Sequence, residues 1–198
     1  PQGEVTSLYG DGGQGKTLLA GQLAYAISRG IPWLGLATKQ MPVLCCMAED
    51  DRGEVHRRVE SYRKHYGSDF DAVGGYLAFF AYPGESYTML SYDSDKPKFG
   101  PLYHRIETWL QNMPAGLKLL ILDTLADVFD GNENIRNQAN AFVKRMLRGI
   151  CTKYDATVLL LAHPSRAGIS GEDLLSGSTA WNNAVRNRLA LAPHKDLP

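Results

Sequence analysis

Apolar residues occur along this chain in two alternating patterns. Short continuous apolar runs are typical of buried parallel strands, and longer segments that repeat an apolar residue every three or four positions are typical of helices. The runs predict strands at Glu4–Tyr9, Pro42–Ala48, Tyr76–Tyr82, Leu117–Leu122, Thr157–Ala162 and Val185–Leu191. The periodic segments predict helices at Lys16–Ser28, Asp51–Tyr66, Tyr103–Met113 and Ile135–Ile150. Because strands and helices alternate, we predict an α/β fold with a mostly parallel, twisted sheet flanked by helices.

One segment interrupts this alternation. Gly84 to Pro101 is rich in Ser, Asp, Pro and Gly, a composition typical of loops, so we predict a long surface excursion there. The length of 198 residues suits a single domain. Since the sequence begins at Pro1 and stops at Pro198 just after an apolar segment, we expect it to be a fragment of a longer chain.

Composition narrows the class of protein. Lys plus Arg and Asp plus Glu both number 21, which excludes a strongly basic binder of nucleic acid or membrane by bulk charge, though not a local basic surface. No apolar run approaches the ~20 residues that span a bilayer. The three cysteines, two of them adjacent at Cys45 and Cys46, do not suit a disulfide framework. We therefore expect a cytoplasmic protein without a membrane partner.

The strongest chemical signal follows the first predicted strand. It matches the phosphate-binding pattern G-x-x-x-x-G-K-[ST], and it lies between a strand and a helix as that chemistry requires. Backbone N–H groups of such a loop converge on the β-phosphate of a nucleotide. The lysine reaches the β- and γ-phosphates, and the hydroxyl is a ligand of Mg²⁺. The residues are Gly10, Asp11, Gly12, Gly13, Gln14, Gly15, Lys16 and Thr17. An accidental glycine-rich turn is the weaker alternative, because both neighbouring elements fit.

Three further residues, two with a carboxylate and one with an imidazole, stand at strand ends. Asp123 ends the fourth strand, at the position from which a carboxylate serves the magnesium; capping of a turn is the alternative. Glu49 follows the second strand, where it can orient the attacking water, whereas Asp50 and Asp51 are assigned to the start of the next helix. His163 ends the fifth strand and can sense the γ-phosphate; a satisfied histidine at a strand end is its alternative.

A second group of residues is not assigned a chemical role. Their most economical interpretation is a solvated helix surface, although they form a possible basic face. They are Arg52, Arg57, Arg58, Arg63 and Lys64.

With these residues identified, the chain resembles the RecA-like core of P-loop ATPases. More narrowly, it is similar to the RepA-like group, typified by plasmid and phage hexameric replicative helicases. The matching blocks are YGDGGQGKT (9–17), MAEDD (47–51) with HRR (56–58), LLILDTLADVF (119–129), LLLAHPSR (159–166) and GSTAWNNAVR (177–186). They follow the family order over most of the chain.

The resemblance implies roles for individual residues. Lys16 and Thr17 bind phosphate and Mg²⁺, Glu49 is the catalytic glutamate, Asp123 is the Walker B aspartate and His163 is the γ-phosphate sensor. Arg186 falls where the family carries an arginine finger that acts on the neighbouring subunit, and Arg188 is the alternative. The loop 165–176 corresponds to a loop facing a central DNA channel, but it holds one basic residue and two acids.

The favoured function is therefore a Mg²⁺-dependent ATPase that drives a DNA motor of the replicative helicase kind. The resemblance implies ATP and Mg²⁺ as cofactors, a homo-oligomer in the form of a hexameric ring, single-stranded DNA, and a primase or other replication partner. Two alternatives remain open: a RecA-like switch in which ATP controls assembly, and a recombinase-like filament former without unwinding activity.

Overall fold

The computed structural model describes residues 1–67, 76–81, 86–94, 96–132, 134–163, 181 and 183–192. Its centre is a sheet of six parallel strands in the order β3-β2-β6-β8-β1-β9. The strands are β1 (Val5–Tyr9), β2 (Val43–Met47), β3 (Leu77–Phe80), β6 (Lys118–Asp123), β8 (Ala156–Ala162) and β9 (Asn187–Ala190). The predicted α/β class with its parallel sheet is confirmed.

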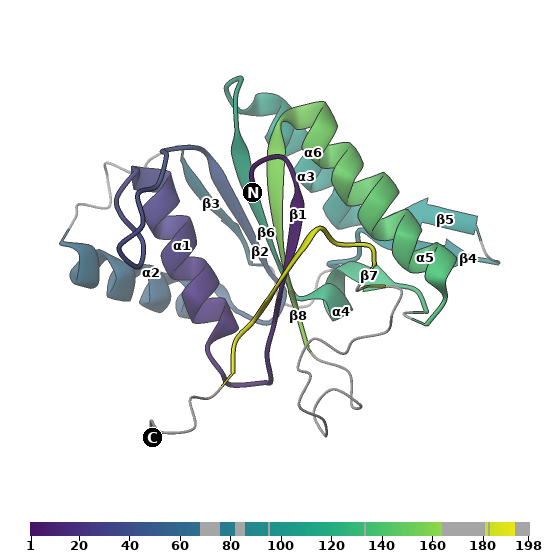
Figure 1. Cartoon of the computed structure of the whole chain (residues 1–198), viewed down its shortest axis with the longest axis horizontal. Helices are drawn as coiled ribbons and strands as arrows, with labels where there is room; N and C mark the ends of the chain where they lie inside the picture. Colours follow the sequence, from purple (N-terminus) through teal and green to yellow (C-terminus); the bar gives the residue numbers. More distant parts are fainter. Residues whose placement is uncertain are drawn as a thin grey trace.

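Helices cover both faces of this sheet (Figure 1). On one side lie α1 (Lys16–Arg29) and α2 (Arg52–Tyr66). On the other side lie α3 (Pro101–Asn112) and a continuous helical stretch formed by α5 (Arg136–Asn140), a π-helical segment (Ala141–Leu147) and α6 (Arg148–Tyr154). Among the described residues no helix has the length and apolar character that crossing a membrane requires.

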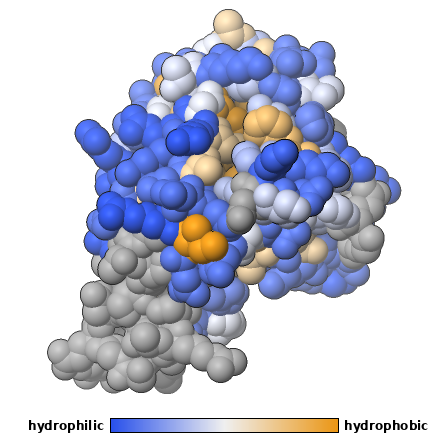
Figure 2. Space-filling view, turned by 90° about the vertical axis from the view of Figure 1, so that its right-hand side faces the viewer, coloured by the Kyte–Doolittle hydropathy of each residue, from blue (hydrophilic) through white to orange (hydrophobic). Residues whose placement is uncertain are grey.

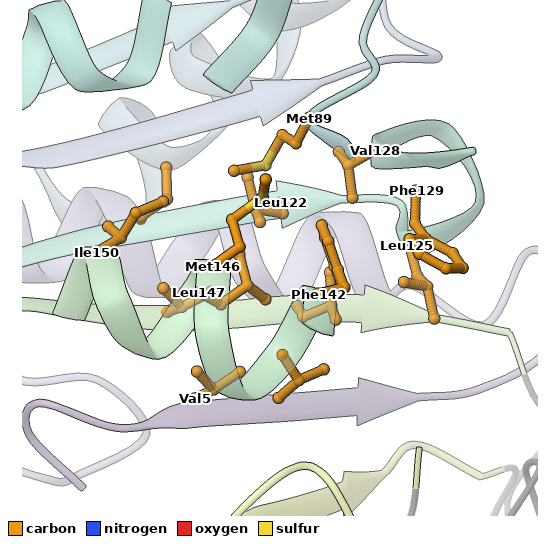
Figure 3. Packing of buried hydrophobic residues seen from close by; sticks show 14 of the residues in the cluster. Val5, Met89, Leu122, Leu125, Val128, Phe129, Phe142, Met146, Leu147 and Ile150 are labelled. Carbon is orange, nitrogen blue, oxygen red and sulfur yellow. The ribbon is translucent and has the colours of Figure 1, made fainter. Parts of the chain in front are cut away.

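The double covering explains the apolar strand runs. Every residue of β1, β2 and β6 is buried, as expected when both faces of a parallel sheet are packed. Figure 3 shows the core on the α5–α6 side, where Phe142, Met146 and Leu147 pack toward Leu122 and Val5. The core therefore holds the central strands rigidly, which fixes the positions of the loops at their ends.

The segment 84–101 differs from the expected surface excursion. It contains β4 (Leu90–Asp93) and β5 (Lys96–Phe99), which pair as an antiparallel hairpin; β4 also pairs with the short β7 (Phe129–Asp130). Met89 and Leu90 are buried in the main core, whereas every residue of β5 is exposed. The excursion is thus a small second sheet anchored by two apolar residues, which its polar composition conceals.

The helix expected at Ile135–Ile150 is longer than predicted. It runs from Arg136 to Tyr154, and its middle turns, Ala141–Leu147, have the wider π-helical hydrogen bonding. Apolar residues every three or four positions fit α- and π-helical turns almost equally well, so the spacing alone does not reveal the π segment.

Candidate functional site

The predicted site residues meet at the carboxyl edge of the main sheet, the lower edge in Figure 1. Strands β1 and β8 pair in parallel with Tyr9 opposite Ala162, and β2 and β6 pair with Met47 opposite Asp123. The loops that follow these four strands therefore begin side by side. The fold brings together segments that lie more than a hundred residues apart in the sequence.

The glycine-rich loop joins β1 to α1 at this edge. Gly15 precedes the helix with φ 87°, a left-handed conformation that favours glycine. A Cβ atom on Gly10 would lie 2.9 Å from the carbonyl oxygen of Leu191, so the end of β9 leaves room only for glycine there. Among the described residues no side chain caps α1, and its first backbone N–H groups therefore point to a place where an anion can bind.

Lys16 lies inside this loop. It is 6% exposed, and its Nζ donates hydrogen bonds to the carbonyl oxygens of Gly10 at 2.6 Å and Asp11 at 3.0 Å. Burial lowers the pKa of Lys16 from its ordinary value, while the negative charges of Asp123, Asp11 and Glu49 oppose this shift. The fold thus holds a partly desolvated cation at the point where phosphates would lie.

Asp123 and Thr17 face one another across the sheet edge. The Thr17 hydroxyl donates a hydrogen bond of 2.6 Å to Asp123 Oδ2. Asp123 is also 6% exposed, and burial raises its pKa; the Thr17 hydrogen bond and Lys16 oppose the shift, while the carboxylates of Glu49 and Asp50 add to it. Thr124, which follows Asp123 after a cis peptide bond, begins the short helix α4 (Leu125–Val128).

The three acidic residues after β2, Glu49 to Asp51, make different contacts. Asp51 caps α2 by accepting a hydrogen bond of 2.7 Å from the backbone N–H of Glu54, as predicted. Asp50 does not cap the helix: its carboxylate pairs with the Arg58 guanidinium at 3.1 Å. Glu49 is exposed and makes no hydrogen bond or ion pair within the described part of the chain. Of the three, Glu49 alone is left available to a ligand.

Arg58 is a residue that sequence reasoning missed. It was grouped with the solvated basic residues, but it contacts both Asp50 and Glu54 and so fixes the chain beside Glu49. A signal was present, because residues 50, 54 and 58 recur every four positions, the spacing that places side chains on one helix face.

His163 and the two arginines have different positions. His163 Nδ1 lies 3.5 Å from Lys16 Nζ, so the predicted sensor touches the phosphate-loop lysine. Arg186 is exposed just before β9, whose Asn187 pairs with Thr6 at the start of β1. Arg188 pairs with Ser7. Arg186 therefore stands at the opposite edge of the sheet, about 16 Å along the strand from Gly10, where its own glycine-rich loop begins. Residues 165–180 lie outside the described residues.

The donor set fits one class of cation. Within the described ranges, no cluster of three or more His, Cys, Asp or Glu residues could hold a metal ion. Thr17 and Asp123 instead offer two oxygen donors beside an anion site. Mg²⁺ is usually held in this way, by one or two protein oxygens together with substrate phosphates and water. The site suits magnesium bound with a nucleotide rather than a metal held by protein alone.

Comparison with known proteins agrees with this geometry. A family model described as an AAA domain matches residues 1–168. The match spans the chain from β1 to beyond β8 and includes every site residue discussed above except Arg186 and Arg188. No curated protein matches the chain.

Proposed function

The chain belongs to the AAA domain family of P-loop ATPases, and from this premise we propose that it hydrolyses ATP with Mg²⁺ to drive a DNA motor of the RepA-like helicase kind. The observation that carries the ATPase part is the meeting of Lys16, Thr17 and Asp123 at one sheet edge. A cation, a hydroxyl and a carboxylate there match the three needs of a bound Mg²⁺-nucleotide.

The residues have separate tasks in this proposal. The backbone N–H groups at the start of α1 bind the β-phosphate. Lys16 exchanges its bonds to Gly10 and Asp11 for bonds to phosphate oxygens. Thr17 and Asp123 would hold Mg²⁺, which would neutralise phosphate charge in the bound nucleotide. The site is built to stabilise charge, and that is the main contribution of proteins to phosphoryl transfer.

Two exposed groups complete the chemistry. Glu49 has no partner among the described residues, and its charge acts on both Lys16 and Asp123; these two features support the proposal that Glu49 orients the attacking water. Asp50 is held by Arg58 and serves as support. His163, beside Lys16, is placed to report the state of the γ-phosphate to the segment that follows it.

The motor part of the proposal requires a second subunit. Arg186 stands at the far edge of the sheet from its own loop, so it is badly placed to help its own ATP. In a ring of identical chains, an arginine on the surface of one subunit serves the ATP of the next. Such a residue contributes a factor of about 10³–10⁵ to the rate in other phosphoryl-transfer enzymes. The proposal includes a hexameric ring as the assembly, single-stranded DNA as the track, and a primase or other replication protein as a partner.

One observation favours a second function. The chain has equal numbers of acidic and basic residues, which suits a RecA-like switch that assembles in response to ATP without moving along DNA. Stimulation of ATP hydrolysis by single-stranded DNA, together with ring-shaped assemblies, supports the motor. Open filaments indicate a recombinase, and hydrolysis that ignores DNA indicates the switch.

The ATPase assignment is tested by replacing Lys16 with Ala. We expect hydrolysis to become undetectable, because the β- and γ-phosphates lose their cation, while circular dichroism shows the fold intact. Lys118→Met is the matched control. Lys118 is as buried as Lys16 and also donates to two carbonyl oxygens, those of Gly116 and Tyr154, but it lies at the amino end of β6. Turnover per folded molecule should survive Lys118→Met; ordinary turnover in Lys16→Ala would contradict the assignment.

A further inference from the structure

A groove lies on the side of the molecule opposite α1 and α2, between the β4–β5 hairpin and the helical stretch Arg136–Tyr154. It has a volume of about 290 Å³. Figure 2 looks onto this side and shows an apolar hollow bordered by hydrophilic surface. The lining residues are Leu90, Pro97, Phe99, Tyr103, Ala141, Arg145, Met146, Gly149, Ile150, Lys153 and Tyr154. Two of these are cations, Arg145 and Lys153, and Lys153 is paired with Glu107 at 2.8 Å.

One wall of the groove is a flat aromatic surface. The ring of Phe99 is stacked on that of Tyr103, with centroids 4.6 Å apart and planes at 19°. Phe99 is nevertheless 54% exposed. The exposed ring of Phe99, backed by the partly buried Tyr103 and beside an apolar floor, is suited to stacking against another flat ring.

The opposite wall is a helix with an unusual charge. Arg136–Tyr154 contains five Lys or Arg residues and no Asp or Glu. Helix α2 also contains five, but its Glu54 and Glu60 pair with four of them. The side chain of Arg145, which lines the groove, makes no hydrogen bond or ion pair with any residue that the structure describes. Two other cations of this stretch pair with acids from elsewhere in the chain, Arg148 with Glu4 and Lys153 with Glu107. The positive charge that this helix offers to a ligand in the groove is therefore mainly that of Arg145.

From these two walls we propose that the groove binds single-stranded nucleic acid. A base stacks on Phe99 over the floor of Leu90 and Ile150, and an adjacent phosphate contacts Arg145. Aromatic stacking combined with a positively charged track is how proteins hold single strands without reading their sequence. This surface differs from the loop 165–176 to which the resemblance assigns DNA, although the inference shares its ligand class with the proposed function.

An acidic peptide is the competing occupant, and the groove suits it less well. A peptide that adds a strand needs an open edge, but the edge strand β5 carries Lys96, Pro97 and Lys98, and proline and lysine there discourage strand pairing. A peptide helix needs several anchor positions along a groove, whereas the described apolar hollow has room for few side chains.

The first test measures the binding of a fluorescein-labelled oligothymidylate of about 20 nucleotides, longer than a typical single-strand site, by fluorescence anisotropy without ATP. Phe99→Ala should raise Kd by about 5- to 150-fold, the range for losing one stacked base, and Phe99→Trp should restore binding. Arg145→Ala should reduce the slope of log K against log salt by about 0.7. Arg57→Ala on α2 is the charge-matched control and should leave both values unchanged.

The second test fills the groove without damaging the fold. Gly149 lines the groove, and a Cβ atom there would meet nothing within 4 Å. Gly149→Leu should therefore block oligonucleotide binding. Gly149→Ala, the matched control, should keep it. Both should raise Tm, the alanine by roughly 2–4 °C, because glycine is a poor residue inside a helix.

The outcomes are distinct. Loss of binding in Phe99→Ala and Gly149→Leu, with basal ATPase unchanged in both, supports the groove. Unchanged oligonucleotide affinity in these variants overturns it, and so does failure of the wild-type chain to bind at about 50 mM salt. Polyglutamate that binds with equal affinity and the same dependence on Phe99 overturns it in favour of an acidic peptide. The Lys16→Ala protein should still bind the oligonucleotide, so loss of ATP hydrolysis can be distinguished from loss of binding in the groove.

Discussion

The carboxyl edge of the sheet and the β4–β5 groove both concentrate charge, but they hold it in opposite ways. At the carboxyl edge, Lys16 and Asp123 are almost fully buried and bond to their own chain. In the groove, Arg145 is exposed, and its side chain bonds to no other described residue. In the first region the charged groups are held by hydrogen bonds to the chain, whereas in the second the guanidinium of Arg145 faces solvent.

The different burial of these charged groups suits the two regions to different tasks. Buried charge is strong because few solvent dipoles screen it, but desolvation makes it costly to fold. Exposed charge costs little and is weakened by salt. The carboxyl edge is therefore equipped for chemistry on one oriented substrate, whereas the groove is equipped for reversible contact with a polyanion.

The largest effect is expected from Arg186, an exposed cation assigned to chemistry. Arg186→Ala should preserve nucleotide binding by the monomer and lower the assembled ATPase rate by about 10³–10⁵, since the guanidinium serves the next subunit. Mixed with Glu49→Gln protein, it should regain part of the activity, because some interfaces then hold both intact groups. Mixed assemblies that form and remain inactive would reject Arg186 and favour Arg188.

A smaller effect separates the neighbours Glu49 and Asp50. Glu49→Gln should bind ATP and Mg²⁺ normally but hydrolyse about 10²–10⁴ times more slowly, the range for losing a general base. Asp50→Asn should be milder, because Asp50 is held by Arg58 rather than left free. Equilibrium binding and single-turnover hydrolysis measure the two steps. The reverse ranking would transfer the catalytic role to Asp50.

The smallest effect is on the free energy of unfolding, and here we expect the substitution to stabilise the protein. Because burial raises the pKa of Asp123, the folded state binds a proton more tightly than the unfolded state, so this carboxylate lowers stability as pH rises through its folded pKa. At neutral pH, Asp123→Asn should therefore raise the free energy of unfolding by about 0.5–2 kcal/mol while ATP hydrolysis is lost. The difference in stability between Asp123→Asn and the wild type, measured by thermal unfolding, should shrink as the pH falls toward the ordinary pKa range of aspartate. An equal or larger gain at low pH would mean that the buried charge is not the cause.

Much of the fold follows from the sequence because burial on both sheet faces produces continuous apolar runs. Strands such as β6, read from LKLLILD, were predicted within a residue or two. The glycine-rich loop was equally clear, since its strand and helix stand on the required sides. The convergence of Lys16 with Asp123 and His163 was expected only through the general behaviour of parallel sheets, whose carboxyl ends share one edge.

The remainder depended on contacts that have no periodic signature. The strand Lys96–Phe99 alternates lysine with proline and phenylalanine at an exposed edge, so hydrophobicity does not mark it as a strand. The pairing of Asp50 with Arg58 depends on the direction in which α2 leaves the sheet. The proximity of Leu191 to Gly10 depends on strand order, which places the last described strand beside the first.

That proximity connects the two ends of β9. The strand pairs with β1 from Asn187 to Ala190, the N–H of Leu191 donates to the carbonyl oxygen of Tyr9 at 2.8 Å, and a Cβ atom on Gly10 would lie 2.9 Å from the Leu191 carbonyl oxygen. Arg186 and the glycine-rich loop therefore lie at opposite ends of one continuously hydrogen-bonded pair of strands. We expect a displacement of Arg186 along the strand to reach Gly10 through these bonds.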